Sequence, residues 1–239
     1  MRRVSFNRLT LVAAVAVVGC AGLAYGQMPG GLGGQGGMGR QPGMSQPGDA
    51  IQSAPVADKP DAAARKAYTA AMKSLRKAKD YEAAAANAAS ADKRAAQLEK
   101  MGDAYDRALD QFTEALSNNG DMVDAWNNVG FIHLRLGAYR EAVDDYNHTL
   151  ALKPDLSEAI LHRGEAHLGV DRLDDAKAAY MDLFNHERPL ADQLLATMQK
   201  WMSNHRADAN GMRASDLDAF DKWLQERDGI AKQTASLPH

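Results

Sequence analysis

Cysteine is almost absent from this chain of 239 residues, in which Cys20 is the only one. A lone cysteine cannot form a disulfide within the chain, so the packing of secondary structure must supply the stability of any folded part. Aromatic residues make up only 6% of the sequence and charged residues 25%. This balance is typical of a soluble helical protein with a modest core.

Clusters of basic residues are also missing after the N-terminal segment, and the net charge is −3. A protein that binds the phosphate backbone needs grouped Lys and Arg side chains, so nucleic acid is not an expected partner. The glycine-rich string at residues 31–36 matches G-x-G-x-x-G, but a dinucleotide site needs a strand before it and a helix after it. No cofactor is therefore expected.

Residues 1–26 have the composition of an export signal, with a basic start and an apolar run at residues 9–18 that is too short to span a bilayer. Two processing routes stay open. Ala24 and Gly26 suit an ordinary signal peptidase that cuts before Gln27, whereas residues 17–20 resemble a bacterial lipobox in which Cys20 is lipidated. The expected location is the periplasm, or the cell envelope as a lipoprotein whose membrane contact is the lipid on Cys20.

Residues 27–60 are rich in Gly, Gln, Pro and Met, and such a segment buries too little apolar area to offset the entropy of ordering. We expect it to be a flexible tether. Residues 61–233 are expected to form a helical domain, in which a first helix bends at Lys79-Asp80 and a second helix ends at Gly102.

A fixed period of 34 residues appears in the middle of this domain. Gly130 recurs as Gly164, Ala142 as Ala176, Tyr146 as Tyr180 and His133 as His167. A period of this length is typical of stacked helical hairpins. Gly130 and Ala142 fall where the two helices of one hairpin cross, and Gly137 falls at the turn, where it can take a positive φ.

Residues 123–156 resemble the tetratricopeptide repeat, whose pattern is W-x2-L-G-x2-Y, A-x3-F and a final P. The matching residues are Trp126, Val129, Gly130, His133, Ala142, Tyr146 and Pro154. The resemblance implies an all-α fold, namely a short right-handed solenoid of helical hairpins with flanking capping helices. The repeats are expected at about 89–122, 123–156 and 157–190, and the C-terminal capping helices at 190–205 and 215–233. The repeat at 89–122 keeps only its second helix well, as Tyr105, Ala108, Phe112, Ala115 and Leu116.

Catalytic and metal-binding groups are not visible in the pattern, so we expect a protein that is not an enzyme and holds no metal. His162 and His167 are five residues apart, which places them on different helix faces and makes them a poor metal pair. His133 and His167 take the place of Tyr in the repeat pattern. We interpret both as packing residues.

The remaining functional candidate is the concave groove that the first helix of each repeat lines in tetratricopeptide arrays. By resemblance, the groove residues are Asp124, Asn127, Asn128, Phe131, Leu134, Arg135, Glu158, Leu161, His162, Glu165 and Leu168. Such a groove suits a protein or peptide partner. Two alternatives stay open: the C-terminal helices pack on some of these apolar residues, or the chain is a structural or assembly subunit without a groove ligand.

Overall fold

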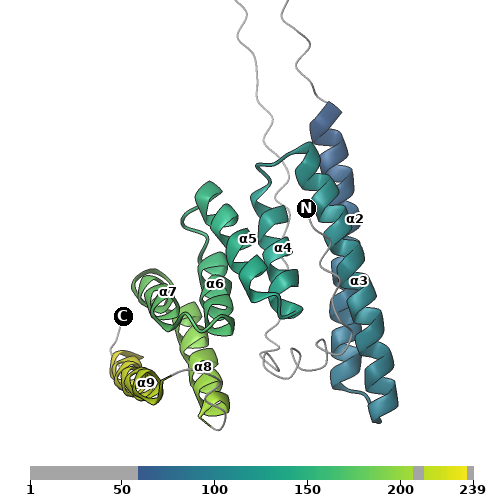
Figure 1. Cartoon of the computed structure of the whole chain (residues 1–239). Coiled ribbons are helices and arrows are strands. Elements are labelled where there is room, and N and C mark those ends of the chain that lie inside the picture. The colour runs from purple at the N-terminus through teal and green to yellow at the C-terminus, as the bar shows by residue number, and fades with distance from the viewer. Residues whose placement is uncertain (1–58, 207–212, 236–239) are drawn as a thin grey trace, which may run out of the picture.

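The computed structural model describes residues 59–206 and 213–235, and every regular element in that part of the chain is a helix (Figure 1). The helices are α2 (Lys59–Ala86), α3 (Ala91–Asn118), α4 (Val123–Arg135), α5 (Tyr139–Leu152), α6 (Ser157–Gly169), α7 (Leu173–His186), α8 (Arg188–His205) and α9 (Ala214–Ala235). The expected all-α fold is confirmed. The predicted export signal, Cys20 and residues 27–58 of the predicted tether lie outside the described residues.

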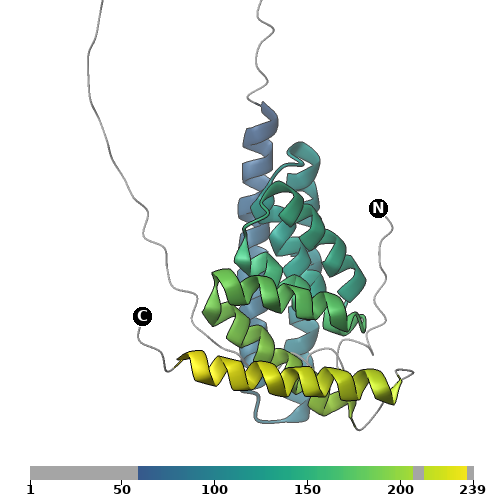
Figure 2. The ribbon, with the colours of Figure 1, turned by 90° about the vertical axis from the view of Figure 1, so that its left-hand side faces the viewer.

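Consecutive helices pair as hairpins, α2 with α3, α4 with α5 and α6 with α7, and these follow one another across the molecule. Helix α8 packs against α6 and α7, and α9 packs against α8. Figures 1 and 2 show α9 at the opposite end of the array from α2 and α3. The buried side chains form one cluster around α2, α3 and α4 and a second that extends from α4 to α9. Each hairpin therefore depends on its neighbours to cover its apolar surface.

The hairpin of α4 and α5 coincides with the strongest repeat pattern, and its close crossing is confirmed. Ala142 is fully buried, and a Cβ atom on Gly130 would lie 3.0 Å from two ring atoms of Tyr146. Gly137 has a φ of 74° at the turn, as predicted. Asp171, one period later, has a φ of 59°. Aspartate is one of the few residues other than glycine that tolerate this left-handed conformation.

The first hairpin differs from the predicted one. Helix α2 continues through the expected bend at Lys79-Asp80, and α3 continues through Gly102. The turn lies instead at residues 87–90, where the Ser90 side chain caps α3. A single glycine costs a helix about 1 kcal/mol, which packing along the rest of the helix readily offsets. The predicted repeat at 89–122 is therefore wrong: this segment is mostly one helix, and its hairpin partner is α2.

The helices that follow the third hairpin begin slightly earlier than predicted. The sequence placed them at 190–205 and 215–233, and the structure has α8 at Arg188–His205 and α9 at Ala214–Ala235. Pro189 lies in the first turn of α8, where a missing backbone N–H costs little. Likewise α2 begins at Lys59, two residues before the predicted start of the helical domain, with Pro60 in its first turn. None of the helices described here is long and apolar enough to cross a membrane.

Candidate functional site

The residues predicted to line the groove lie on α4 and α6, and they differ in exposure. Asp124 and Glu158 are exposed. The partly exposed side chains are Asn127, Asn128, Phe131, Arg135, His162 and Glu165. Leu134, Leu161 and Leu168 are each only 2% exposed. The structure therefore brings eight of the predicted residues to or near the surface and places the three leucines inside.

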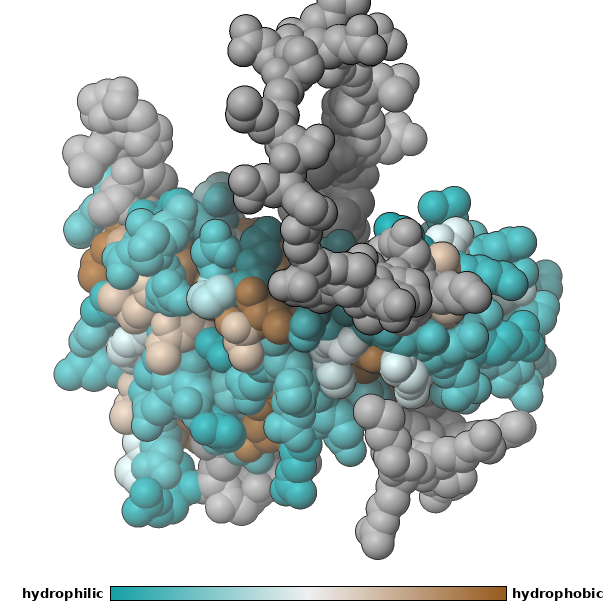
Figure 3. All heavy atoms as spheres, turned by 90° about the horizontal axis from the view of Figure 1, so that it is seen from above, coloured by the Kyte–Doolittle hydropathy of each residue, from teal (hydrophilic) through white to brown (hydrophobic). Residues whose placement is uncertain are grey.

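The prediction that the three leucines contact a partner is wrong, because all three belong to a core cluster that also contains Leu194 and Met198 of α8. Helix α8 packs against α6, as the alternative with covering C-terminal helices required. Burial of a leucine side chain contributes about 2 kcal/mol, so these residues stabilise the array. What remains accessible of the predicted groove is mostly polar. The face of the molecule seen in Figure 3 is also mostly hydrophilic, with apolar residues in small groups.

Helix α2 contributes to the same surface, which the sequence did not predict. Arg135 at the end of α4 forms an ion pair with Glu82 of α2. The Glu82 carboxylate also accepts a hydrogen bond of 3.3 Å from the Tyr105 hydroxyl. The ammonium group of Lys79 lies 4.6 Å from the centroid of the Phe131 ring, a cation–π contact. Because α2 lies outside the clear repeat pattern, no sequence signal pointed to Lys79 or Glu82.

The contacts continue from α4 to α6 and α8. The rings of Phe131 and His162 meet edge to face, with 5.9 Å between their centroids. His162 Nδ1 lies 3.0 Å from Oε2 of Glu165, and the Thr197 hydroxyl of α8 donates a hydrogen bond of 3.3 Å to Glu165 Oε1. We use the term cross-helix row for the side chains joined in this way: Lys79, Glu82, Phe131, Arg135, His162, Glu165 and Thr197. The row connects α2, α4, α6 and α8.

Burial shifts two pKa values along this surface, and neighbouring charges add smaller contributions. Burial lowers the pKa of Lys79, the charge of Arg135 lowers it further, and Glu158 on α6 opposes both. The pKa of this α2 side chain therefore depends on charges on α4 and on α6, the first helices of the next two hairpins. Burial also raises the pKa of the Tyr68 hydroxyl, with a smaller contribution from the charge of Asp124 on α4. These helices thus form one continuous electrostatic surface.

The histidines of α6 lie on different faces, as predicted. His162 contacts Phe131 and Glu165, whereas His167 borders a cleft beside Asp175 of α7. In residues 59–206 and 213–235, no group of three or more His, Cys, Asp or Glu side chains is placed to hold a metal ion.

The fold and this surface define a class of protein: an array of helical hairpins of the kind that engages other proteins. Residues 123–156 match the profile of the tetratricopeptide repeat, and α4 and α5 with their connecting turn are therefore a repeat of this type. The chain is also 30% identical to the protein called Protein SGT1 homolog from Oryza sativa subsp. japonica. This similarity extends over 79 residues, which are 33% of the chain. The matched segment covers 22% of that protein, so the chain spans about a fifth of the length of this curated relative. The repeat match indicates protein–protein interaction as the general function.

Proposed function

We propose that the chain is a non-enzymatic scaffold that binds a protein or peptide partner through the face carrying the cross-helix row. The observation that carries this proposal is Asn127, whose side-chain oxygen is buried and accepts no hydrogen bond from the described residues. A buried acceptor without a donor costs about 1–3 kcal/mol. Asn127 as a whole is partly exposed, so a partner that turns its amide outward can donate a backbone or side-chain N–H to the oxygen and remove that cost.

The contacts within the row support a surface that is formed before the partner arrives. Phe131 and Arg135 are already held by side chains of α2, and Glu165 is held by His162 and Thr197. Side chains with fixed neighbours lose little rotamer freedom on binding, so less of the interaction energy is lost to ordering. Because the leucines are buried, the partner we propose is recognised mainly through hydrogen bonds and charges, with Phe131 as its apolar contact.

We also propose that this scaffold works in the cell envelope, after export by residues 1–26 and at the end of a tether formed by residues 27–58. The mature chain is either free in the periplasm after cleavage behind Gly26 or anchored through a lipid on Cys20. The mass of the N-terminal peptide of the purified mature protein separates these forms. If the protein isolated from cells still carries residues 1–19, neither the cleaved nor the lipidated form is correct.

Photo-crosslinking in the cell tests the binding face. A crosslinking residue in place of Glu158, which is exposed on α6, is expected to capture a defined partner, whereas the same residue in place of Asp144, exposed on α5, is not. Asn127→Ala should reduce the yield at position 158 about tenfold, since the lost hydrogen bond corresponds to roughly 1.4 kcal/mol. The captured protein is identified by mass spectrometry.

Equal capture from both positions, or no effect of Asn127→Ala on capture, contradicts binding at this face. Capture of a second copy of the chain from position 144, together with a dimer or larger species in sedimentation of the full chain, supports the alternative of an assembly subunit.

A further inference from the structure

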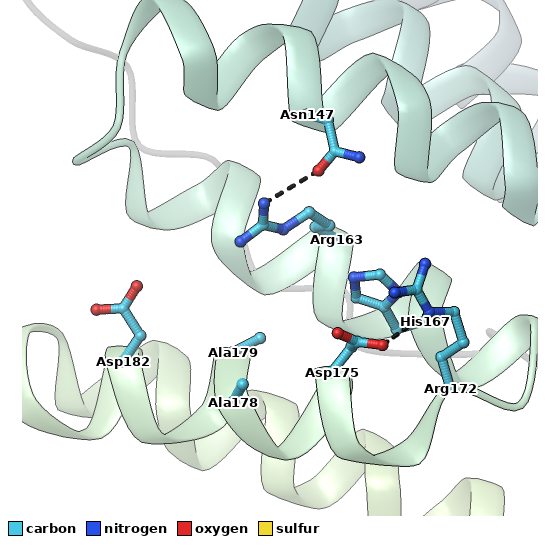
Figure 4. Close-up of a pocket in the computed structure, with 8 residues that line it drawn as sticks. All are labelled: Asn147, Arg163, His167, Arg172, Asp175, Ala178, Ala179 and Asp182. Carbon is cyan, nitrogen blue, oxygen red and sulfur yellow. Dashed lines mark hydrogen bonds and ion pairs between the residues drawn. The ribbon is translucent and has the colours of Figure 1, made fainter.

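A polar cleft of about 300 Å³ lies between α5, α6 and α7 (Figure 4). Its lining residues are Asn147, Arg163, His167, Arg172, Asp175, Ala178, Ala179 and Asp182. Successive residues of a helix are turned by about 100°, so Arg163 and His167 are about 100° and 140° around α6 from His162. The cleft is therefore on a different face of α6 from the cross-helix row.

Two buried nitrogen atoms at this cleft lack hydrogen-bond partners among the described residues. The His167 side chain is only 6% exposed, and its Nδ1 atom is unpaired. The Nε atom of Arg163 is also buried and unpaired, although another nitrogen of the same guanidinium donates a hydrogen bond of 3.1 Å to Asn147 Oδ1. Native structures rarely leave buried polar atoms unpaired, because each costs about 1–3 kcal/mol. The cleft wall thus holds one donor without an acceptor, Arg163 Nε, and a second one at His167 Nδ1 whenever the ring carries a proton on that atom.

The preceding repeat shows which acceptor is missing. One period before His167, Nδ1 of His133 lies 2.5 Å from the Oδ2 atom of Asp145, a carboxylate that is itself buried. One period after Asp145 the chain has Ala179, which lines the cleft. The second repeat therefore keeps the histidine and replaces its carboxylate partner with a small side chain beside open space. Arg163, where the first repeat has Val129, adds a guanidinium to the same place.

We propose that this cleft binds a single carboxylate group, supplied by a small organic acid or by an acidic side chain of a bound protein. The carboxylate takes the place beside His167 that Asp145 takes beside His133, and it accepts hydrogen bonds from His167 Nδ1 and Arg163 Nε. The other charged groups limit the site to one negative charge. Arg172 is already paired with Asp175 at 2.7 Å, and Asp182 lines the same cleft, so a second negative charge would be repelled.

Binding is expected to be coupled to proton uptake by His167. Burial lowers the pKa of His167; of its charged neighbours, Asp175 raises it, and Arg172 and Arg163 lower it. Asp182 on α7 and the neutral Asn147 on α5 complete the polar groups that line the cleft. A bound carboxylate favours the imidazolium form, so it raises the pKa of His167 again. Affinity therefore increases as the pH falls toward the ordinary histidine pKa of about 6.5.

Titration of the full chain with sodium acetate and with the blocked peptide acetyl-Ala-Glu-Ala-amide tests the proposal. The ring resonances of His167, assigned with a His167→Gln variant, are followed by NMR against sodium chloride at equal ionic strength. We expect a saturable shift of the His167 ring and not of the His133 ring, and tighter binding at about pH 6 than at about pH 8. Stronger binding of the peptide indicates an acidic side chain as the source, and equal or stronger binding of acetate indicates a small acid.

Two substitutions of adjacent alanines provide the matched comparison. Ala179→Asp restores the carboxylate of the first repeat, so it should abolish binding and move the His167 resonances toward those of His133. Ala178→Asp adds the same charge at an exposed neighbour and should weaken binding only a few-fold. Arg163→Gln should weaken binding about tenfold even if Ala179→Asp does not fold.

The proposal is overturned if neither carboxylate shifts the His167 ring beyond the chloride control, or if inorganic phosphate binds and the carboxylates do not. Unchanged binding by a folded Ala179→Asp protein, or by Arg163→Gln, overturns it as well. Because the cleft lies on another face of α6, Asn127→Ala should leave acetate binding intact. Failure of the cleft proposal can therefore be distinguished from failure of partner binding at the face with the cross-helix row.

Discussion

Replacement of Gly169 by alanine is expected to destabilise the protein by about 3 kcal/mol, because an added methyl group has no space. Gly169 is the last residue of α6, and a Cβ atom there would lie 2.2 Å from Cγ of Tyr139 and 2.4 Å from both Cδ atoms of the ring. The ring of Tyr139, at the start of α5, thus lies directly on the backbone of the next hairpin. The methyl group must push α5 and α6 apart or displace the ring. Urea unfolding of the two proteins measures the difference.

Gly229→Ala is the matched control, because Gly229 lies within α9 and, apart from the backbone next to it in that helix, none of the described residues has an atom within 4 Å of its added Cβ. This substitution should leave stability unchanged or raise it by up to about 1 kcal/mol, as alanine favours helix. Equal stability of the two variants would rule out the close contact at Gly169. Combining Gly169→Ala with Tyr139→Ala should cost less than the sum of the two single changes, since removal of the Tyr139 ring leaves space for the added methyl group.

The contact at Gly169 also shows what the sequence could not reveal. The repeat pattern singled out Gly130 and Gly164, because these recur at one period and lie inside helices. Gly169 has no glycine one period earlier; the chain has Arg135 there. Its constraint comes from a ring on the neighbouring hairpin, and such a contact depends on how hairpins stack. Periodicity describes what each hairpin shares with the others, so it misses what differs between them.

The same limit explains the first hairpin. Helices α4 to α7 were predictable because side chains of one type return after 34 residues, at positions where helices cross. Helix α2 and helix α3 each have 28 residues, about twice the length of α4 to α7. The pattern placed Tyr105, Ala108 and Phe112 correctly on a second helix of a hairpin, and all three are buried in α3. The first helix was sought one period away, inside α3, because the pattern assumes equal lengths.

The candidate site was predictable only in part, for a related reason. The pattern identifies which side of α4 and α6 faces away from the second helix of each hairpin, and this located Asn127, Phe131 and His162 on the accessible surface. Whether an apolar residue on that side is free depends on later helices, and α8 packs against α6, which carries Leu161 and Leu168. The sequence already showed that Arg163 and His167 depart from the residue types of the tetratricopeptide pattern at their positions. Only the structure showed that they border one cleft.

The positions of the cross-helix row and of the polar cleft, on two faces of α6, depend on how tightly the α4–α5 hairpin is packed. Tyr146 is central to that packing. Its side chain is fully buried, its ring lies against Gly130 of α4, and its centroid is 6.1 Å from that of His162 on α6. The same side chain therefore fills the space within one hairpin and between two. Loss of this ring is expected to affect the whole array.

Tyr146→Ala should accordingly lower the free energy of unfolding by about 4 kcal/mol, since removal of a large buried aromatic side chain leaves a cavity that rigid helices cannot fill. Tyr146→Phe is the control, and it should cost at most about 1 kcal/mol because the ring remains. The chain already uses phenylalanine in this way: Phe112, one period earlier, is fully buried in α3. Unfolding in urea, followed by circular dichroism, gives both values. If Tyr146→Ala were no less stable than Tyr146→Phe, the ring would not be what joins the two hairpins.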